Sequence, residues 1–105
     1  MKKVIFLPQA EQEMNQAAIF YDKHRQGLGR EFLSMIKKGT DAISINPISY
    51  PIQRNGIRRI LVGRFPYGIM YCDEEEQIVV IAVMHLHRAP DYWIHRVSEQ
   101  ASEYR

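Results

Sequence analysis

The sequence is short of cysteine and of long apolar runs. Cys72 is the only cysteine, which excludes an internal disulfide and a cysteine-based zinc site, and we expect it to pack as a small apolar residue. The opening stretch MKKVIFLPQAEQE has only a short apolar run before Pro8, too short for a signal peptide or a membrane span. We therefore predict a cytoplasmic protein without a membrane partner.

Acidic residues are missing from the middle of the chain. None occurs between Asp41 and Asp73, a window that contains Arg54, Arg58, Arg59 and Arg64. The net charge of +2 is too small to imply a nucleic-acid partner by itself. The uneven distribution predicts a surface that is basic on one side, and the alternative is a mixed, solvated surface with no ligand.

Length and composition indicate one folded unit. The 105 residues are 46% hydrophobic and 25% charged, which are ordinary values for a globular protein. We predict a single domain over residues 1–105, with a flexible tail from about residue 97. His85 and His87 are spaced as a metal pair, but no third ligand has a suitable spacing, so we expect neither a metal nor a cofactor.

Helical patterns follow a first short strand. Residues 3–7 are a β-rich run that ends at Pro8, a residue well suited to begin a helix. Apolar residues at three- and four-residue steps predict a helix over 9–26, and Gly27 is expected to end it in a left-handed conformation. A second helix follows and stops at Asn46-Pro47.

The rest of the chain has strand patterns. After a loop with Pro51, Asn55 and Gly56, three consecutive strands are predicted over 58–65, 67–73 and 77–86. The order is β-α-α-β-β-β. It predicts an α+β domain whose antiparallel sheet carries the helix pair on one face and leaves the other face partly free.

The last strand is apolar on both sides, as expected of a central strand, until it reaches its two histidines. Strict alternation places one set of side chains on one side, namely Ile81, Val83, His85 and His87. The other side carries Ala82, Met84 and Leu86. The histidines thus emerge where the core ends, and Arg58 and Arg64 also lie toward the ends of their predicted strand.

These strands carry motifs of a known family. The motifs are an arginine-led strand at Arg58 and Arg59, the PYGI segment, an acidic turn, and a V-x-H-x-x-R ending before Trp93. The chain resembles the RelE/ParE superfamily, the toxins of bacterial type II toxin-antitoxin modules of the plasmid-stabilisation kind. The resemblance covers residues 4–93, and the FPYGI segment and the MHLHRAPDYW ending look closer to the ParE-like branch.

The resemblance implies two mechanisms. RelE-type members cut messenger RNA on the ribosome, whereas ParE-type members poison DNA gyrase. For a nuclease, the catalytic residues would be His85, His87 and Arg88, with arginines to hold the phosphate. The chain has Gly68 where an arginine usually opens the strand in the nucleases, so the nuclease set is incomplete and enzymatic activity is undecided.

Surface contacts are the second role that the resemblance implies. The candidates for target or antitoxin binding are Arg58, Arg59, Arg64, Tyr67, Tyr92 and Trp93. His85 has an equally plausible structural role in hydrogen bonding, and strand aromatics more often pack in cores or interfaces than stack on bases.

We therefore expect a toxin that inhibits growth until a cognate antitoxin neutralises it, acting by ParE-like poisoning of gyrase. A ribosome-dependent mRNA endonuclease remains one alternative. A non-toxic family member that acts only as a binding partner remains the other.

Overall fold

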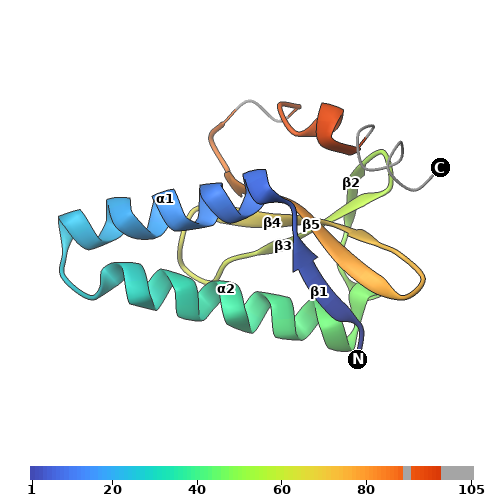
Figure 1. Ribbon diagram of the computed structural model, residues 1–105, viewed down its shortest axis with the longest axis horizontal. Helices are drawn as coiled ribbons and strands as arrows, with labels where there is room; N and C mark the ends of the chain where they lie inside the picture. Colours follow the sequence, from blue (N-terminus) through green and yellow to red (C-terminus); the bar gives the residue numbers. More distant parts are fainter. Residues whose placement is uncertain (89–90, 98–105) are drawn as a thin grey trace.

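A computed structural model describes residues 1–88 and 91–97 of the chain. Its elements are β1 (Lys3–Phe6), α1 (Pro8–His24), α2 (Leu28–Ile45), the 3₁₀ turn η1 (Pro47–Ser49), β2 (Ile52–Arg54), β3 (Ile57–Leu61), β4 (Tyr67–Asp73) and β5 (Gln77–His85) (Figure 1). The strands form one sheet in the order β1-β5-β4-β3-β2. Only β1 and β5 pair in parallel, and the remaining pairs are antiparallel. The predicted α+β class and the central position of the last strand are confirmed.

The helix pair starts close to the residues that the sequence indicated, but α1 ends at His24 with Arg25 as its cap, and Gly27 precedes α2 instead of capping α1. Pro8 is the first residue of α1, and Gly27 adopts the left-handed conformation at the start of α2. Asp22 Oδ1 accepts hydrogen bonds from the backbone N–H groups of Gly27 and Gly29, at 3.0 and 3.1 Å. A Cβ at Gly29 would overlap the carbonyl oxygen of Ala18, so glycine allows the two helices to approach closely.

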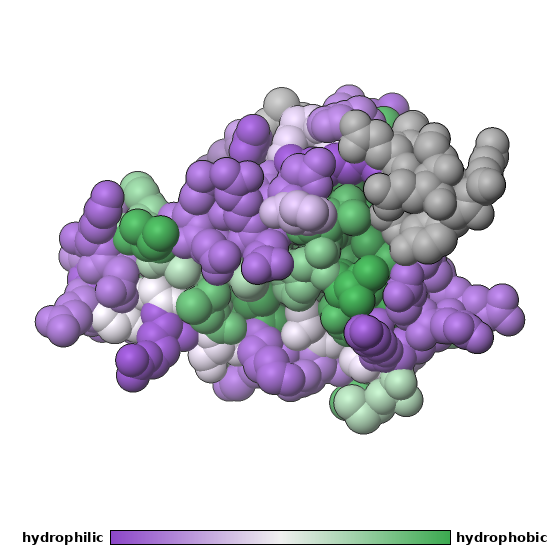
Figure 2. Space-filling model, viewed as in Figure 1, coloured by the Kyte–Doolittle hydropathy of each residue, from purple (hydrophilic) through white to green (hydrophobic). Residues whose placement is uncertain are grey.

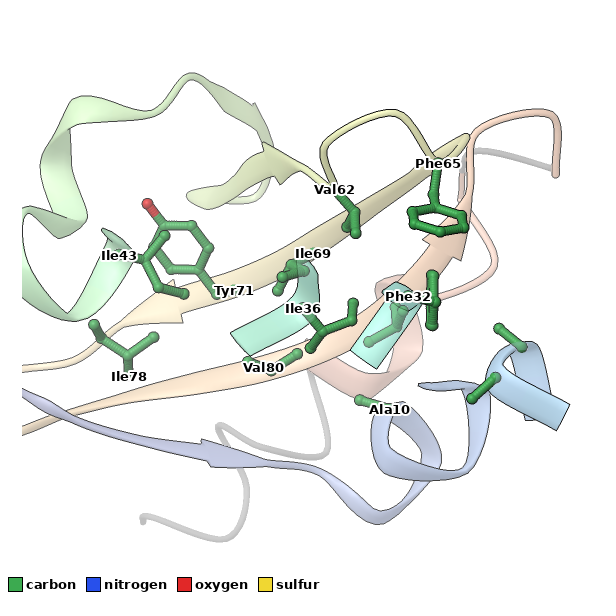
Figure 3. Close-up of a cluster of buried hydrophobic side chains, with 13 residues drawn as sticks. Ala10, Phe32, Ile36, Ile43, Val62, Phe65, Ile69, Tyr71, Ile78 and Val80 are labelled. Atoms are coloured by element: carbon green, nitrogen blue, oxygen red, sulfur yellow. The ribbon is translucent and has the colours of Figure 1, made fainter. Parts of the chain in front are cut away.

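The main core lies between the helix pair and one face of the sheet. Figure 1 shows α1 and α2 running side by side, and Figure 3 shows their apolar side chains pointing toward those of β4 and β5. Phe32, Ile36 and Ile43 of α2 meet Ile69 and Val80 there, all nearly fully buried. Burying aliphatic and aromatic side chains of this size supplies the main drive for folding.

The opposite face of the sheet is covered over β4 and β5, but Leu61 of β3 on the same face is 55% exposed, so this face is free only in part. Its buried residues include Met70, Ile81 and Met84, and Trp93 packs on them with only 1% of its surface exposed. Residues 91–97 run as a turn and one helical turn over this face, and Val97 packs there as well. The predicted tail lies, apart from Val97, outside the described residues.

Strand β2 was not predicted, and the predicted range of the strand after it was too long. Residues 52–54 were expected in a loop, but they pair with β3 through a tight turn at Asn55 and Gly56, both with positive φ. An Asn-Gly turn of this kind suits a hairpin because its twist matches that of the strands. Strand β3 ends at Leu61 instead of residue 65, since residues 62–66 form the turn into β4.

An irregularity in β5 changes which residues share a face. Met70 pairs with Ala82 and Tyr71 with Val80, so Ile81 is an extra residue in the strand. Ile81 therefore packs with Ala82 and Met84 on the Trp93 side, and the alternation that placed it with Val83 and His85 was wrong at this position.

The molecular surface mixes hydrophilic areas with patches of apolar side chains. The face in Figure 2 is mostly hydrophilic, with hydrophobic surface gathered toward its middle. Ile19 and Phe20 on α1 are each more than half exposed. Neither helix is long and apolar enough to cross a membrane, in the part of the chain that the structure describes. The cytoplasmic location stays a prediction.

Candidate functional site

The site is built where β1 leaves the sheet and exposes the edge of β5. The parallel pairing ends at Phe6 and Val80, because the chain then enters α1 at Pro8. Beyond that point side chains replace the missing strand. Glu13 Oε1 accepts a hydrogen bond from the N–H of Val83 at 3.1 Å, and Arg96 Nη1 donates to the Ile81 carbonyl at 3.1 Å. Buried backbone groups at a sheet edge need such partners.

Glu13 is the centre of a buried polar cluster. Both terminal nitrogens of Arg96 donate hydrogen bonds to its carboxylate, at 2.9 and 3.2 Å, and the Tyr92 hydroxyl donates to Oε2 at 2.7 Å. The side chains of Glu13 and Arg96 are only 14% and 10% exposed. Burial raises the pKa of Tyr92, and its hydrogen bond to the Glu13 carboxylate raises the pKa further. The cluster fastens the segment 92–97 to α1 and β5.

A surface pocket of about 230 Å³ opens beside this cluster, and we call it the α1–β5 pocket. Its polar lining is Glu13, Gln16, Tyr67, His85 and Arg88, and its apolar lining is Ala17, Phe20 and Val83. Arg88 is 58% exposed, lies 4.0 Å above the Tyr92 ring and approaches Glu13 Oε2 to 3.9 Å. The structure thus brings together His85 and Arg88, two of the residues predicted from the sequence.

His85 is held by its neighbours at the end of β5. The backbone N–H of His87 donates to His85 Nδ1 at 3.1 Å, which leaves Nε2 to carry the ring proton. The Tyr67 ring meets the His85 ring edge-on at 5.2 Å, and burial raises the pKa of Tyr67. His87 lies in the turn after the strand, where its ring contacts that of His85.

The other predicted arginines lie apart from this pocket. Arg58 donates to the carbonyls of Ile48 and Tyr50 and so holds the loop after α2. Arg59 projects from the other face of the sheet, where its aliphatic stem lies over Gly68. Arg64 is paired with Glu31 at 2.6 Å. The three guanidinium groups therefore do not converge on one ligand.

The predicted aromatic residues divide between pocket and core. Tyr67 lines the α1–β5 pocket, and Tyr92 forms a platform under Arg88. Trp93 lies in the second core, and its Nε1 is buried without a hydrogen-bond partner in the described residues. Its side chain packs against the sheet instead of presenting a contact surface.

Sequence reasoning missed Glu13 and Arg96. A signal for Glu13 was present, because it is three residues after Ala10 and four before Ala17, within the apolar stripe of the first helix. A charged residue in that stripe must either be exposed or find a buried partner. Arg96 carried no comparable signal, since its partner comes from the other end of the chain.

Comparison with known proteins is decisive for the family. The family model described as "ParE toxin of type II toxin-antitoxin system, parDE" matches residues 4–90. The chain belongs to the ParE toxin family. A solved structure, the "Chromosomal ParDE TA system from P. aeruginosa", is similar with a TM-score of 0.73 at 11% identity, over 83% of this chain and 98% of that one. No curated protein matches.

Family membership confirms the predicted superfamily and its ParE-like branch. This ParE family protein is a toxin of the type II toxin-antitoxin class, a class in which toxin and antitoxin form one module. The structural likeness, at so low an identity, supports the fold.

Proposed function

We propose that this ParE family toxin inhibits growth by binding DNA gyrase, that it breaks no bond itself, and that a cognate antitoxin neutralises it. The proposal that the protein breaks no bond is supported mainly by the arginines, which lie apart from one another. Arg58 is engaged with backbone carbonyls, Arg64 with Glu31, and Arg59 lies on the other face of the sheet.

The chemistry of RNA cleavage explains why this scattering matters. Attack by a ribose 2′-hydroxyl needs a base, an acid and cations that meet at one phosphate. Of the candidate cations, only Arg88 lines the α1–β5 pocket, and the Glu13 carboxylate lies within 3.9 Å of it. An added Cβ at Gly68 would lie 2.9 Å from Cδ of Arg59, so the Arg59 side chain would have to shift to admit an arginine there.

A ribosome-dependent endonuclease is the second candidate. Its support is that His85, Tyr67 and Arg88 line one pocket and include a possible acid or base and one cation. On this alternative, alanine at His85 or Arg88 abolishes toxicity while the protein remains folded. On the gyrase proposal, the same residues matter only through contact with a partner.

Pulse labelling in cells tests the proposal. The toxin is induced without antitoxin, and incorporation of labelled thymidine and labelled amino acid is followed over the first minutes. We expect thymidine incorporation to fall first. An earlier fall in amino-acid incorporation would instead support the nuclease. If neither falls while the folded protein accumulates, the chain is a non-toxic binding partner.

A further inference from the structure

Three hydrogen-bond donors of the α1–β5 pocket have no hydrogen-bond acceptor among the described residues. Arg88 is 58% exposed: its guanidinium lies over the Tyr92 ring at 4.0 Å and forms a distant ion pair with Glu13 at 3.9 Å, but it donates no hydrogen bond within the part of the chain that the structure describes. The Tyr67 hydroxyl and His85 Nε2 have no hydrogen-bond partner among the residues that the structure describes. Donors that surround an open pocket suit a ligand that brings acceptor atoms.

The charge of the pocket favours one carboxylate. Glu13 is compensated by Arg96, by Tyr92 and by the Val83 N–H, so Arg88 is the charge that remains available. A single guanidinium beside neutral donors such as the Tyr67 hydroxyl and the His85 ring N–H matches a singly charged carboxylate. A phosphate with a second negative charge would face the Glu13 carboxylate with no further cation in the described lining.

The shape of the pocket favours a protein side chain. Its volume of about 230 Å³ is that of a small surface hollow, not of a cofactor site. Phe20 lies at the pocket and is 54% exposed, so an apolar side chain next to the carboxylate would cover it. A protein segment with an acidic residue next to an apolar one would supply both the carboxylate and the apolar side chain.

We propose that the α1–β5 pocket receives an aspartate or glutamate side chain of the antitoxin, with the carboxylate bound by Arg88, His85 Nε2 and the Tyr67 hydroxyl. The inference rests on the proposed function in one respect, namely that an antitoxin neutralises this toxin. We infer that the antitoxin supplies this side chain, because family membership makes it a protein partner of this chain.

Calorimetric titration of the purified toxin with the antitoxin encoded in the same module tests the proposal. Arg88→Glu should weaken binding by about 10- to 100-fold, since it removes a charge-assisted hydrogen bond and adds a repulsive charge. Tyr67→Phe removes one hydroxyl and should weaken binding by roughly fivefold. Arg30→Glu is the matched control, because Arg30 is exposed on α2, outside this pocket, and the charge change is the same. Its affinity should stay within about threefold of the wild type.

A charge swap identifies the partner residue. Each acidic residue of the antitoxin is changed to arginine and titrated against the Arg88→Glu toxin, and one of these changes should restore binding. Circular dichroism checks that each toxin variant is folded. If Arg88→Glu does not fold, Arg88→Gln and Tyr67→Phe provide the same comparison.

Two results would overturn the proposal. One is an Arg88→Glu toxin that binds the antitoxin as tightly as the Arg30→Glu toxin does. The other is a wild-type toxin that binds a single-stranded RNA oligonucleotide through Arg88 while Arg88→Glu leaves antitoxin affinity unchanged, which makes the pocket a phosphate site. Because titration needs no toxicity, a failure here is distinct from a failure of the gyrase proposal, which thymidine incorporation measures.

Discussion

Glu13 shows how much one side chain determines in this small fold. Its carboxylate accepts hydrogen bonds from β5 through Val83 and from the following segment through Tyr92 and Arg96. The sequence alone indicated that Glu13 needs a buried partner, because it is an acidic residue within an apolar stripe. The identity of that partner could not be predicted, since Arg96 is 83 residues away and only the tertiary fold brings it to Glu13.

Removing the charge of Glu13 should destabilise the protein. Glu13→Gln preserves size and leaves the buried Arg96 cation without its counter-ion, a change that should lower the free energy of unfolding by about 2–4 kcal/mol. Urea denaturation followed by circular dichroism measures the loss. Glu11→Gln, at an exposed position on the same helix, should cost less than about 1 kcal/mol. Equal losses in the two variants would show that the buried cluster adds nothing to stability.

At the scale of elements, local signals were predictable and long-range pairing was not. The starts of α1 and α2 were recognised because Pro8 and Gly27 act within their own turn of the chain. Strand β2 was missed because three residues are too few for a periodic pattern. The extra residue at Ile81 arises from its pairing with β4 and the packing of Trp93, neither of which is visible in a strand's own alternation.

The close approach of α1 and α2 at Gly29 should make that position intolerant of a side chain. Gly29→Ala should lower the free energy of unfolding by about 1–3 kcal/mol, because the new Cβ overlaps the Ala18 carbonyl oxygen and the helices must separate. This loss should outweigh the gain of about 1 kcal/mol that alanine brings in helix propensity. Thermal and denaturant unfolding measure it. Ser34→Ala, exposed on the same helix, should change stability by no more than about 0.5 kcal/mol. A stabilised Gly29→Ala protein would contradict the tight packing.

The whole molecule is a sheet with side chains packed on both faces. The helix pair covers one face, and the segment 91–97 with Trp93 covers part of the other. The element order was predictable from the sequence, but the second cover was not, because DYW following a strand carries no periodic pattern. Tyr92 and Trp93 therefore have different roles: Tyr92 belongs to the polar cluster around Glu13 and supports Arg88, whereas Trp93 is core.

Removing the Trp93 side chain should expose the sheet face that the segment 91–97 covers. Trp93→Ala should cost about 3–5 kcal/mol in stability and should increase binding of the dye ANS, because apolar residues such as Met70 and Met84 lose their cover. Denaturant unfolding and dye fluorescence measure the two effects. Phe20→Ala, at an aromatic residue that is 54% exposed, is the control and should change both only slightly. Similar behaviour of the two variants would mean that the cover is not part of the stable fold.

The parallel pair of β1 and β5 also sets the time at which the protein can form during its synthesis. Lys3 pairs with Gln77, and Phe6 with Val80, so the first strand of the chain has no place in the sheet until the last strand has left the ribosome. At about 5–20 residues per second, β1 waits roughly 4–15 s for its neighbour. A nascent chain that stops before β5 lacks the strand that joins β1 to β4, and with it the β5 side of the α1–β5 pocket. An interrupted translation product is therefore not a smaller toxin but an unfolded chain.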